Sequence, residues 1–174
     1  MTWNIDATHS HATFSVRYML VSTVKGKFNV LSGTLNIDEA NPANSSIEAE
    51  VDATSIDTNE PNRDNHLRSP DFFDVEKYPK LTFKSTKVEP AGDNEYKVTG
   101  DLTMHGVTKP VVFNVEYSGQ AKDPSGSQHA GFSAKTKISR KEWGLTWNQL
   151  IETGGALVSD EVKIEVDLAA VTKA

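Results

Sequence analysis

One short stretch of the sequence, RDNHLRSPDFFD at positions 63–74, gathers the side chains best suited to chemistry. A histidine there could act as a general base, and arginines could hold an anionic group through paired hydrogen bonds. Its phenylalanines could instead close one end of a barrel. The stretch is therefore a candidate active site, ligand clamp or plug. Its polar members are Arg63, Asp64, His66, Arg68, Asp71 and Asp74, set around Leu67, Phe72 and Phe73.

The histidines do not indicate a metal site. They are His9, His11, His66, His105 and His129, and no two have the spacing of a known metal motif. The chain has no cysteine and no G-x-S-x-G motif, so neither a cysteine nucleophile nor a hydrolase serine is predicted. We expect no metal and no cofactor.

The stretch is predicted to form a short helix. Thr58 or Asn59 can cap a helix whose first turn contains Glu60 and Pro61 and which ends near Ser69, before the next proline. A helix of this length buries little by itself, so we expect it to cover part of a larger sheet.

The helix side chains favour the plug over the other two roles. Asp64 and Arg68 are four residues apart, where helical side chains meet. His66 and Leu67 point to different sides, so only one of them is expected to face the sheet. In the interpretation we favour, Arg63, Asp64 and His66 fasten the helix to neighbouring strands and the two following phenylalanines close the barrel.

A ligand head group is the alternative partner of these polar side chains. Arg63 and His66 could hold it, and Arg17 and Arg140, predicted in strands or at their ends, are further candidates for pairing an anion. Burying a charged head group without such donors would be costly.

Elsewhere the sequence alternates apolar and polar residues with a period of two, which is typical of half-buried strands. The alternation is almost unbroken at 46–54, 95–105 and 161–169. Bulges are predicted near Ser32–Gly33 and near Ser85, where the alternation changes phase. Shorter alternating runs occur around 14–16, 28–30, 81–83, 111–117 and 132–138.

About eight strands joined by short turns favour an all-β antiparallel meander, and closure into a barrel removes its exposed edges. We expect one domain over residues 1–174, an eight-stranded barrel with one short helix and a loop with a helical turn at 142–160. Whether the barrel is hollow stays open, because small residues on the apolar faces could leave space or could face large neighbours. These small residues are Ala12, Ala49, Ala53, Gly100, Ala134 and Thr136.

Composition excludes several partners. The 174-residue chain carries a formal net charge of −6 and no dense run of basic residues, so nucleic acid is not an expected partner. No stretch approaches the roughly 18 apolar residues that span a bilayer. The first ten residues, MTWNIDATHS, lack the features of a secretory signal, so we expect a cytoplasmic protein, or a periplasmic one if the sequence is a mature form.

The sequence resembles the YceI-like family. The resemblance rests on the combination of D-x-x-H-S at 6–10, R-D-x-H-L-x-S-x-D-F-F at 63–73 and L-T-x-H-G-V-T-K-P at 102–110, and it extends from Trp3 to about Val171. One departure is Tyr18, where many family members have histidine. Because a phenol takes up no proton near neutral pH, a pH-linked role at this position is not expected.

The resemblance implies a lipocalin-like barrel, a homodimer, and a long isoprenoid or quinone-like lipid in an apolar tunnel, for transport or storage. Two other functions stay open. One is an enzyme that acts on such a lipid with His66 or His105 as base; the other is a filled barrel that acts through protein contacts, for instance in a stress response. From the phase of each strand, the tunnel is predicted to be lined by Phe14, Val16, Phe28, Phe83, Leu102, Met104, Phe113 and Phe132.

Overall fold

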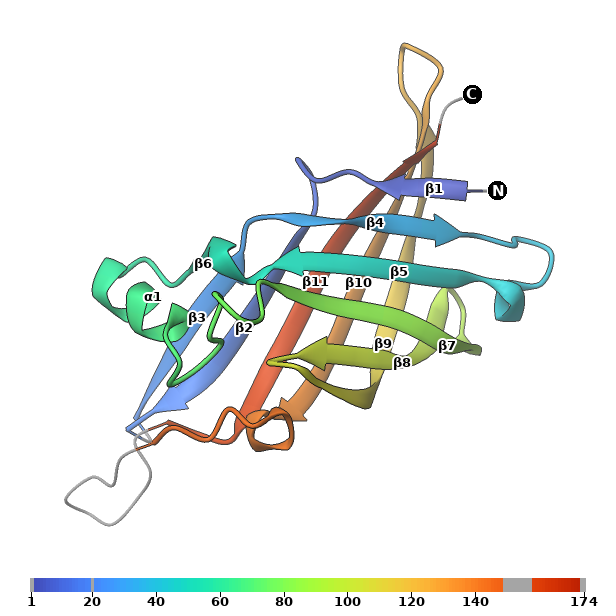
Figure 1. The fold of residues 1–174 in the computed structure, drawn as a ribbon. Coiled ribbons are helices and arrows are strands. Elements are labelled where there is room, and N and C mark those ends of the chain that lie inside the picture. The colour runs from blue at the N-terminus through green and yellow to red at the C-terminus, as the bar shows by residue number, and fades with distance from the viewer. Residues whose placement is uncertain (1, 20, 149–157, 173–174) are drawn as a thin grey trace.

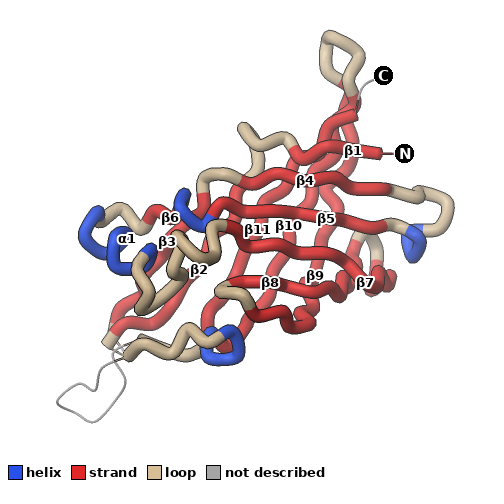
Figure 2. The backbone as a smooth tube through the Cα atoms, in the orientation of Figure 1, coloured by secondary structure: helices blue, strands red, loops and turns tan. Residues whose placement is uncertain are grey.

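The computed structural model describes residues 2–19, 21–148 and 158–172. Within them, eleven strands form one antiparallel sheet, with one α-helix, α1 (Pro61–Arg68), and three short 3-10 helices (Figures 1 and 2). The 3-10 helices are η1 (Pro42–Asn44), η2 (Ala53–Ser55) and η3 (Arg140–Trp143). The strands are β1 (Thr2–Ile5), β2 (His11–Tyr18), β3 (Ser22–Phe28), β4 (Leu31–Asn36), β5 (Ser46–Asp52), β6 (Ile56–Asp57), β7 (Lys80–Gly92), β8 (Glu95–Met104), β9 (Val107–Lys122), β10 (Gln128–Ser139) and β11 (Glu161–Thr172).

The sheet closes on itself through β1, which pairs with β4 on one side and β11 on the other. β1 and β2 together occupy one strand position of the barrel wall, because β2 also pairs with β11. On its other side β2 pairs with β3. In the same way, β3 and β4 together occupy a second position of the wall, and β5 and β6 occupy a third. With these three broken pairs each counted once, the described strands make an eight-stranded meander barrel, as the alternation predicts.

The three broken strands interrupt their ladders at the same level of the barrel, at 6–10, 29–30 and 53–55. Serine hydroxyls replace the missing backbone partners there. The Ser10 Oγ accepts from the Ala169 amide at 2.9 Å and donates to the Ala169 carbonyl at 3.2 Å. The Ser55 Oγ accepts from the amides of Asn29 and Val30 at 3.1 and 3.2 Å. The wall can therefore bend without leaving these backbone groups unpaired.

Two of the local predictions are wrong in detail. The bulge near Ser85 is confirmed, but pairing between β4 and β5 runs without a shift past Ser32–Gly33, and the break in this wall lies at 29–30 instead. The helix is present, but its N-cap is Glu60, whose carboxylate accepts from the Arg63 amide at 2.6 Å. Thr58 is not the cap because its amide and hydroxyl bond to Asp64 inside the helix.

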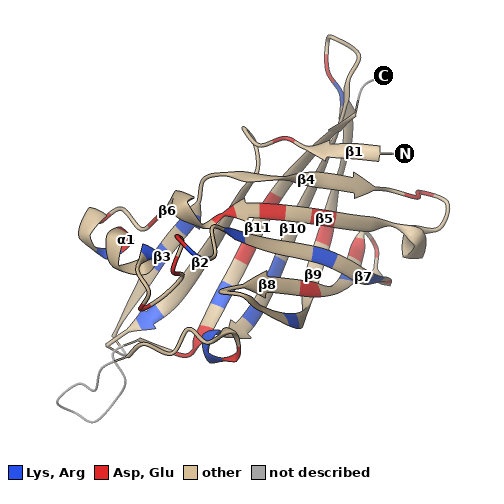
Figure 3. Ribbon diagram, in the orientation of Figure 1, with Lys and Arg blue, Asp and Glu red and all other residues tan. Residues whose placement is uncertain are grey.

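Acidic and basic residues are interspersed along the strands (Figure 3). Lys80 pairs with Glu50, and Lys84 lies 3.5 Å from Glu48 across the β5–β7 ladder. Exposed pairs of this kind contribute about 0–1 kcal/mol each, so they do not explain the fold's stability.

Two apolar clusters supply the core. One gathers around Trp3, where the ends of the sheet meet, and the other around Trp143 of η3, whose indole N–H donates to the Leu102 carbonyl at 2.9 Å. Both tryptophans are 1% exposed. Neither cluster fills the space between the walls, where a cavity remains.

Gly33 gives a stability test of the barrel wall. Its φ is +144°, and a Cβ there would overlap the carbonyl oxygen of Glu48 on β5. Gly119 also has a positive φ, +109°, but a Cβ added to it would have no atom within 4 Å. It is therefore the matched control. We expect Gly119→Ala to cost about 1–3 kcal/mol through backbone strain alone.

Gly33→Ala should cost at least about 1 kcal/mol more than the control, because the overlap adds to the strain. Urea unfolding of both variants measures the difference. Equal losses would show that the β4–β5 wall yields to the added methyl group.

Candidate ligand-binding cavity

A cavity of about 1040 Å3 occupies the interior of the barrel. This volume is at the upper end of the roughly 300–1,000 Å3 found for small-molecule sites. The side chains of this eight-stranded barrel therefore leave it hollow. Every strand from β2 to β11 except β6 contributes lining residues, most of them apolar.

The eight residues predicted to line the tunnel all line this cavity. They are Phe14, Val16, Phe28, Phe83, Leu102, Met104, Phe113 and Phe132. Their phenylalanine rings contact one another in pairs: Phe14 and Phe28 at 5.7 Å between centroids, and Phe83 and Phe113 at 5.1 Å. Paired aromatic rings prefer defined orientations, so these contacts favour particular positions of the rings in the lining.

Of the small residues, Ala12, Ala49 and Ala134 leave space in the cavity, whereas Gly100 does not. A Cβ on Gly100 would overlap the ring of Phe83, so this glycine makes room for a protein side chain. Small residues therefore have both of the roles that the sequence leaves open: some leave space in the cavity, and one makes room for a large neighbouring side chain.

Helix α1 lies at one end of the cavity and carries a buried polar network. The Thr58 amide and hydroxyl donate to one Asp64 carboxylate oxygen at 2.8 and 2.5 Å. The Arg63 guanidinium donates to the hydroxyl and the carbonyl of Thr58 at 2.8 and 2.7 Å. Thr58 and Asp64 are buried, while Arg63 is exposed, and Thr58 and Arg63 line the cavity. The network joins the helix to Thr58, the residue after β6, so Arg63 and Asp64 fasten it there, whereas His66, the third predicted fastening, pairs with Asp71 and with no strand of the described residues.

The expected Asp64–Arg68 contact is not made. Arg68 instead donates to the backbone carbonyls of Thr54 and Ile56, both at 3.0 Å, because Asp64 points inward to Thr58. His66 and Leu67 both line the cavity, although only one of them was expected to face the barrel.

An aromatic cluster completes this end. The His66 ring contacts Phe72 at 5.1 Å and Trp147 at 4.8 Å, both edge to face, and its Nε2 lies 2.9 Å from the Asp71 carboxylate. Phe73 packs against Phe28 at 5.7 Å. Phe72, Phe73 and Trp147 all line the cavity, so these rings narrow its end.

Arg140 is a buried cation beside the cavity, 4% exposed. Its guanidinium donates to the carbonyls of Leu145 at 2.6 Å and Ser159 at 2.9 Å. Asp160 lies 3.9 Å away. Burial lowers the pKa of Arg140, and the Asp160 charge opposes that effect. Its carbonyl partners indicate that it holds together the segments before and after residues 149–157. Residues 149–157, the middle part of the predicted loop at 142–160, lie outside the described residues.

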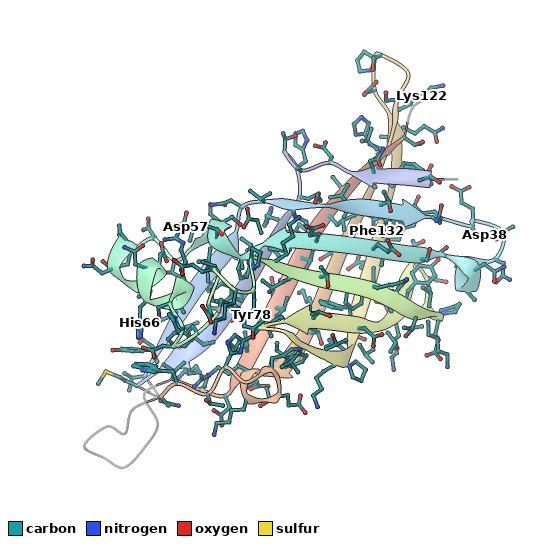
Figure 4. The ribbon with its side chains drawn as sticks, in the orientation of Figure 1. Asp38, Asp57, His66, Tyr78, Lys122 and Phe132 are labelled. Carbon is teal, nitrogen blue, oxygen red and sulfur yellow. The ribbon has the colours of Figure 1, made fainter. Side chains whose placement is uncertain are left out.

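The opposite end of the cavity is acidic and amide-rich. Asp38, Glu39 and Gln120 line it, and the Gln120 amide donates to Glu39 at 2.5 Å. Burial is the main cause of the raised pKa of the Tyr117 phenol, which also lines this end. Figure 4 shows His66 and Asp38 at the two ends, with Phe132 between them. The α1 end therefore combines aromatic rings with Arg63, His66 and Glu60, and the opposite end carries Asp38 and Glu39.

The remaining histidines lie away from the cavity lining. His105 sits in the β8–β9 turn with its Nδ1 3.1 Å from the Trp143 carbonyl, so it does not face the space where a ligand would lie. His9, His11 and His129 each lie beside one aspartate. Within the described residues, no three acidic or histidine side chains form a group that could hold a metal ion.

Sequence reasoning missed the network partner Thr58 and the cluster member Trp147. The position of Thr58 in the sequence predicts a helix cap and not a partner of Asp64, and Trp147 lies outside any alternating run. The aromatic composition of 142–147 was the one available signal.

Comparison with known proteins places this geometry in a family. The model of the YceI-like domain matches residues 3–170. A Vibrio cholerae protein described as a UPF0312 protein is 45% identical over 143 residues, which cover 81% of this chain and 76% of that protein.

Solved structures have the same fold. The crystal structure of BcnA from Burkholderia cenocepacia superposes with a TM-score of 0.81 and 28% identity, covering 95% of this chain and 98% of that one. A polyisoprenoid binding domain from Saccharophagus degradans has a TM-score of 0.69 and 19% identity over 97% of each chain. Within the described residues, no helix is long and apolar enough to cross a membrane. The matched domain, the sequence identity and the shared barrel agree, and the chain belongs to the YceI-like family.

Proposed function

We propose that this protein binds one long apolar lipid of the isoprenoid or quinone type inside the barrel and carries or stores it without changing it. The observation that carries the proposal is the cavity of about 1040 Å3 with its largely apolar lining. A hydrocarbon chain gains about 25 cal/mol for each Å2 of apolar surface that it buries there. A relative of the same fold described as a polyisoprenoid binding domain supports this class of ligand.

The ends of the cavity suggest how the ligand lies. Arg63 and His66 at the α1 end provide donors for an anionic or polar head group, whereas Glu39 at the opposite end would repel an anion. We therefore propose that the head group lies at the α1 end and the tail extends toward Asp38. In this proposal, Arg63 is both a fastening of the helix and a contact for the ligand.

The absence of turnover is part of the proposal. His66 is a cavity-lining imidazole, and its Nε2 lies 2.9 Å from Asp71. Within the described residues, no group of histidine and acidic side chains could hold a metal ion for metal catalysis, and the sequence contains no cysteine to serve as a nucleophile. Homodimer formation also stays a proposal.

Native mass spectrometry of freshly purified protein, followed by organic extraction, tests ligand binding directly. We expect one lipid per chain, recovered with the same mass after prolonged incubation. A protein that stays ligand-free after incubation with polyprenols and quinones would refute the proposal, and a changed lipid mass would indicate an enzyme.

Narrowing the cavity should shorten the accepted ligand. Ala134 on β10 lines the cavity, and Ala134→Phe places a ring in space that no protein atom fills. We expect the variant to fold, because this space is vacant, and to bind long polyprenols at least about tenfold more weakly.

Lys135→Tyr on the exposed side of the same strand is the control. Titration of both variants with polyprenols of increasing length provides the measurement. Unchanged affinity of Ala134→Phe for every length would place the ligand elsewhere.

Arg63→Ala separates fastening from ligand contact. Loss of the two bonds to Thr58 should cost about 1–3 kcal/mol in the free energy of unfolding. If Arg63 also holds the head group, affinity for a polyprenyl phosphate should fall more than affinity for the neutral polyprenol of equal length. Equal losses for the two ligands would leave Arg63 with the fastening role alone.

A further inference from the structure

Two buried glycines of the barrel wall each lie against a phenylalanine ring. Gly26 on β3 pairs directly with Phe14 on β2, and a Cβ added to Gly26 would lie 2.4 Å from that ring. Gly100 on β8 has the same relation to Phe83 on β7, also at 2.4 Å. Glycine is unfavourable inside a strand, because it loses more conformational freedom on folding than any other residue. Its presence at both positions therefore indicates that a side chain there would be in the way.

The backbone itself does not require glycine at position 26. The φ of Gly26 lies outside the positive region that favours glycine, so an alanine is compatible with this strand. The three atoms nearest to an added Cβ all belong to side chains, two to the Phe14 ring and one to Thr58. Position 100 differs, because the backbone oxygen of Lys84 would also lie 2.6 Å from the Cβ. The positions of the Phe14 and Thr58 side chains are therefore what require glycine at position 26.

The Phe14 ring lies between Gly26 and the cavity. Gly26 is buried, whereas Phe14 is half-buried and lines the cavity. The Phe28 ring lies beside it at 5.7 Å between centroids, and Phe28 packs in turn against Phe73. Because the interior around these rings is packed, a methyl group on Gly26 would displace the Phe14 ring toward the vacant side, which is the cavity. The width of the cavity at this level therefore depends on Gly26.

We infer that Gly26 is a specificity-determining residue. By letting the Phe14 ring lie against the wall, it keeps the cavity wide enough for a methyl-branched chain at the α1 end. The choice of an isoprenoid as the natural branched chain rests on the proposed function, whereas the width rests on the packing alone. In an isoprenoid the first methyl branch lies close to the head group. With the head group at the α1 end, that branch would lie near Phe14, since Thr58, which bonds to the helix, also borders Gly26.

A straight hydrocarbon chain would use this width less well. It is thinner than a methyl-branched chain, so it leaves gaps along the wall and loses dispersion contacts there. A narrower cavity should favour the straight chain instead, because the methyl branch would then overlap the displaced ring. A single methyl group in an apolar pocket changes affinity by about tenfold or more, so the preference between the two chains is measurable.

Competition between phytanol and hexadecanol tests the inference on the full chain. Both are saturated alcohols with the same main chain, and only phytanol carries methyl branches. Protein freed of resident lipid is incubated with equal amounts of the two, and the bound alcohols are extracted and quantified by gas chromatography. We expect the wild-type protein to retain more phytanol than hexadecanol, and Gly26→Ala to lower the bound phytanol-to-hexadecanol ratio about tenfold.

Gly131→Ala on β10 is the matched control. A Cβ at Gly131 would lie 3.5 Å from its nearest neighbour, the Cβ of Ser118, which is an ordinary contact, so the ratio should stay that of the wild type. Combining Gly26→Ala with Phe14→Leu leaves the added methyl group no ring to displace. The ratio of this double variant should return at least to the wild-type value. Thermal unfolding verifies that each variant is folded.

A ratio for Gly26→Ala equal to that for Gly131→Ala would overturn the inference. So would a double variant that keeps the lowered ratio, because the effect would then not pass through Phe14. If Gly26→Ala does not fold, Phe14→Leu alone decides: the smaller side chain should raise the ratio, and an unchanged ratio would overturn the inference.

The same experiment separates the inference from the proposed function. Wild-type protein that takes up both alcohols, shows the expected shift in ratio and binds no polyprenol or quinone would refute the proposed function and uphold the inference. Uptake of neither alcohol would overturn both.

Discussion

The barrel depends on the pairing of β1 with both β4 and β11, because this one short strand joins the two ends of the sheet. Closure gives β1 a partner on each side and sets the circumference at eight strands, which encloses more space than these side chains fill. Three wall positions are interrupted, at 6–10, 29–30 and 53–55. There the hydroxyls of Ser10 and Ser55 take the bonds that the ladder gives up. The cavity is thus a consequence of how the backbone is satisfied.

The polar groups of the α1 end follow the same rule. Asp64 is buried, and its carboxylate receives two bonds from Thr58, so its burial is compensated and the helix is held in place. Arg63 completes this network from the exposed side and still borders the cavity. A single group of side chains can therefore close the barrel and present donors to its interior, so the plug and the proposed clamp share residues.

The lining could be predicted from sequence because an alternating strand has only two faces. Once the strands were located, Phe83, Leu102 and Phe132 could lie only inside or outside. Features that depend on contacts between distant segments could not be predicted in this way. Thr58 satisfies the sequence rules for a cap, and only the fold shows that Asp64 takes its hydroxyl instead. Gly33 and Gly100 look alike in the sequence, yet one borders a carbonyl and the other a phenylalanine ring.

The β1–β11 pairing also constrains when the protein can acquire its ligand. It joins Asn4 to Val171 and Ile5 to Ala170, so it is among the last contacts that a growing chain can make. Contacts of such long sequence separation form late in folding, because the loop-closure entropy must first be overcome. During synthesis the inward phenylalanines belong to an open, curling sheet with no enclosed interior until β11 has left the ribosome. In the proposed function, lipid therefore enters the barrel only after synthesis of the chain is complete.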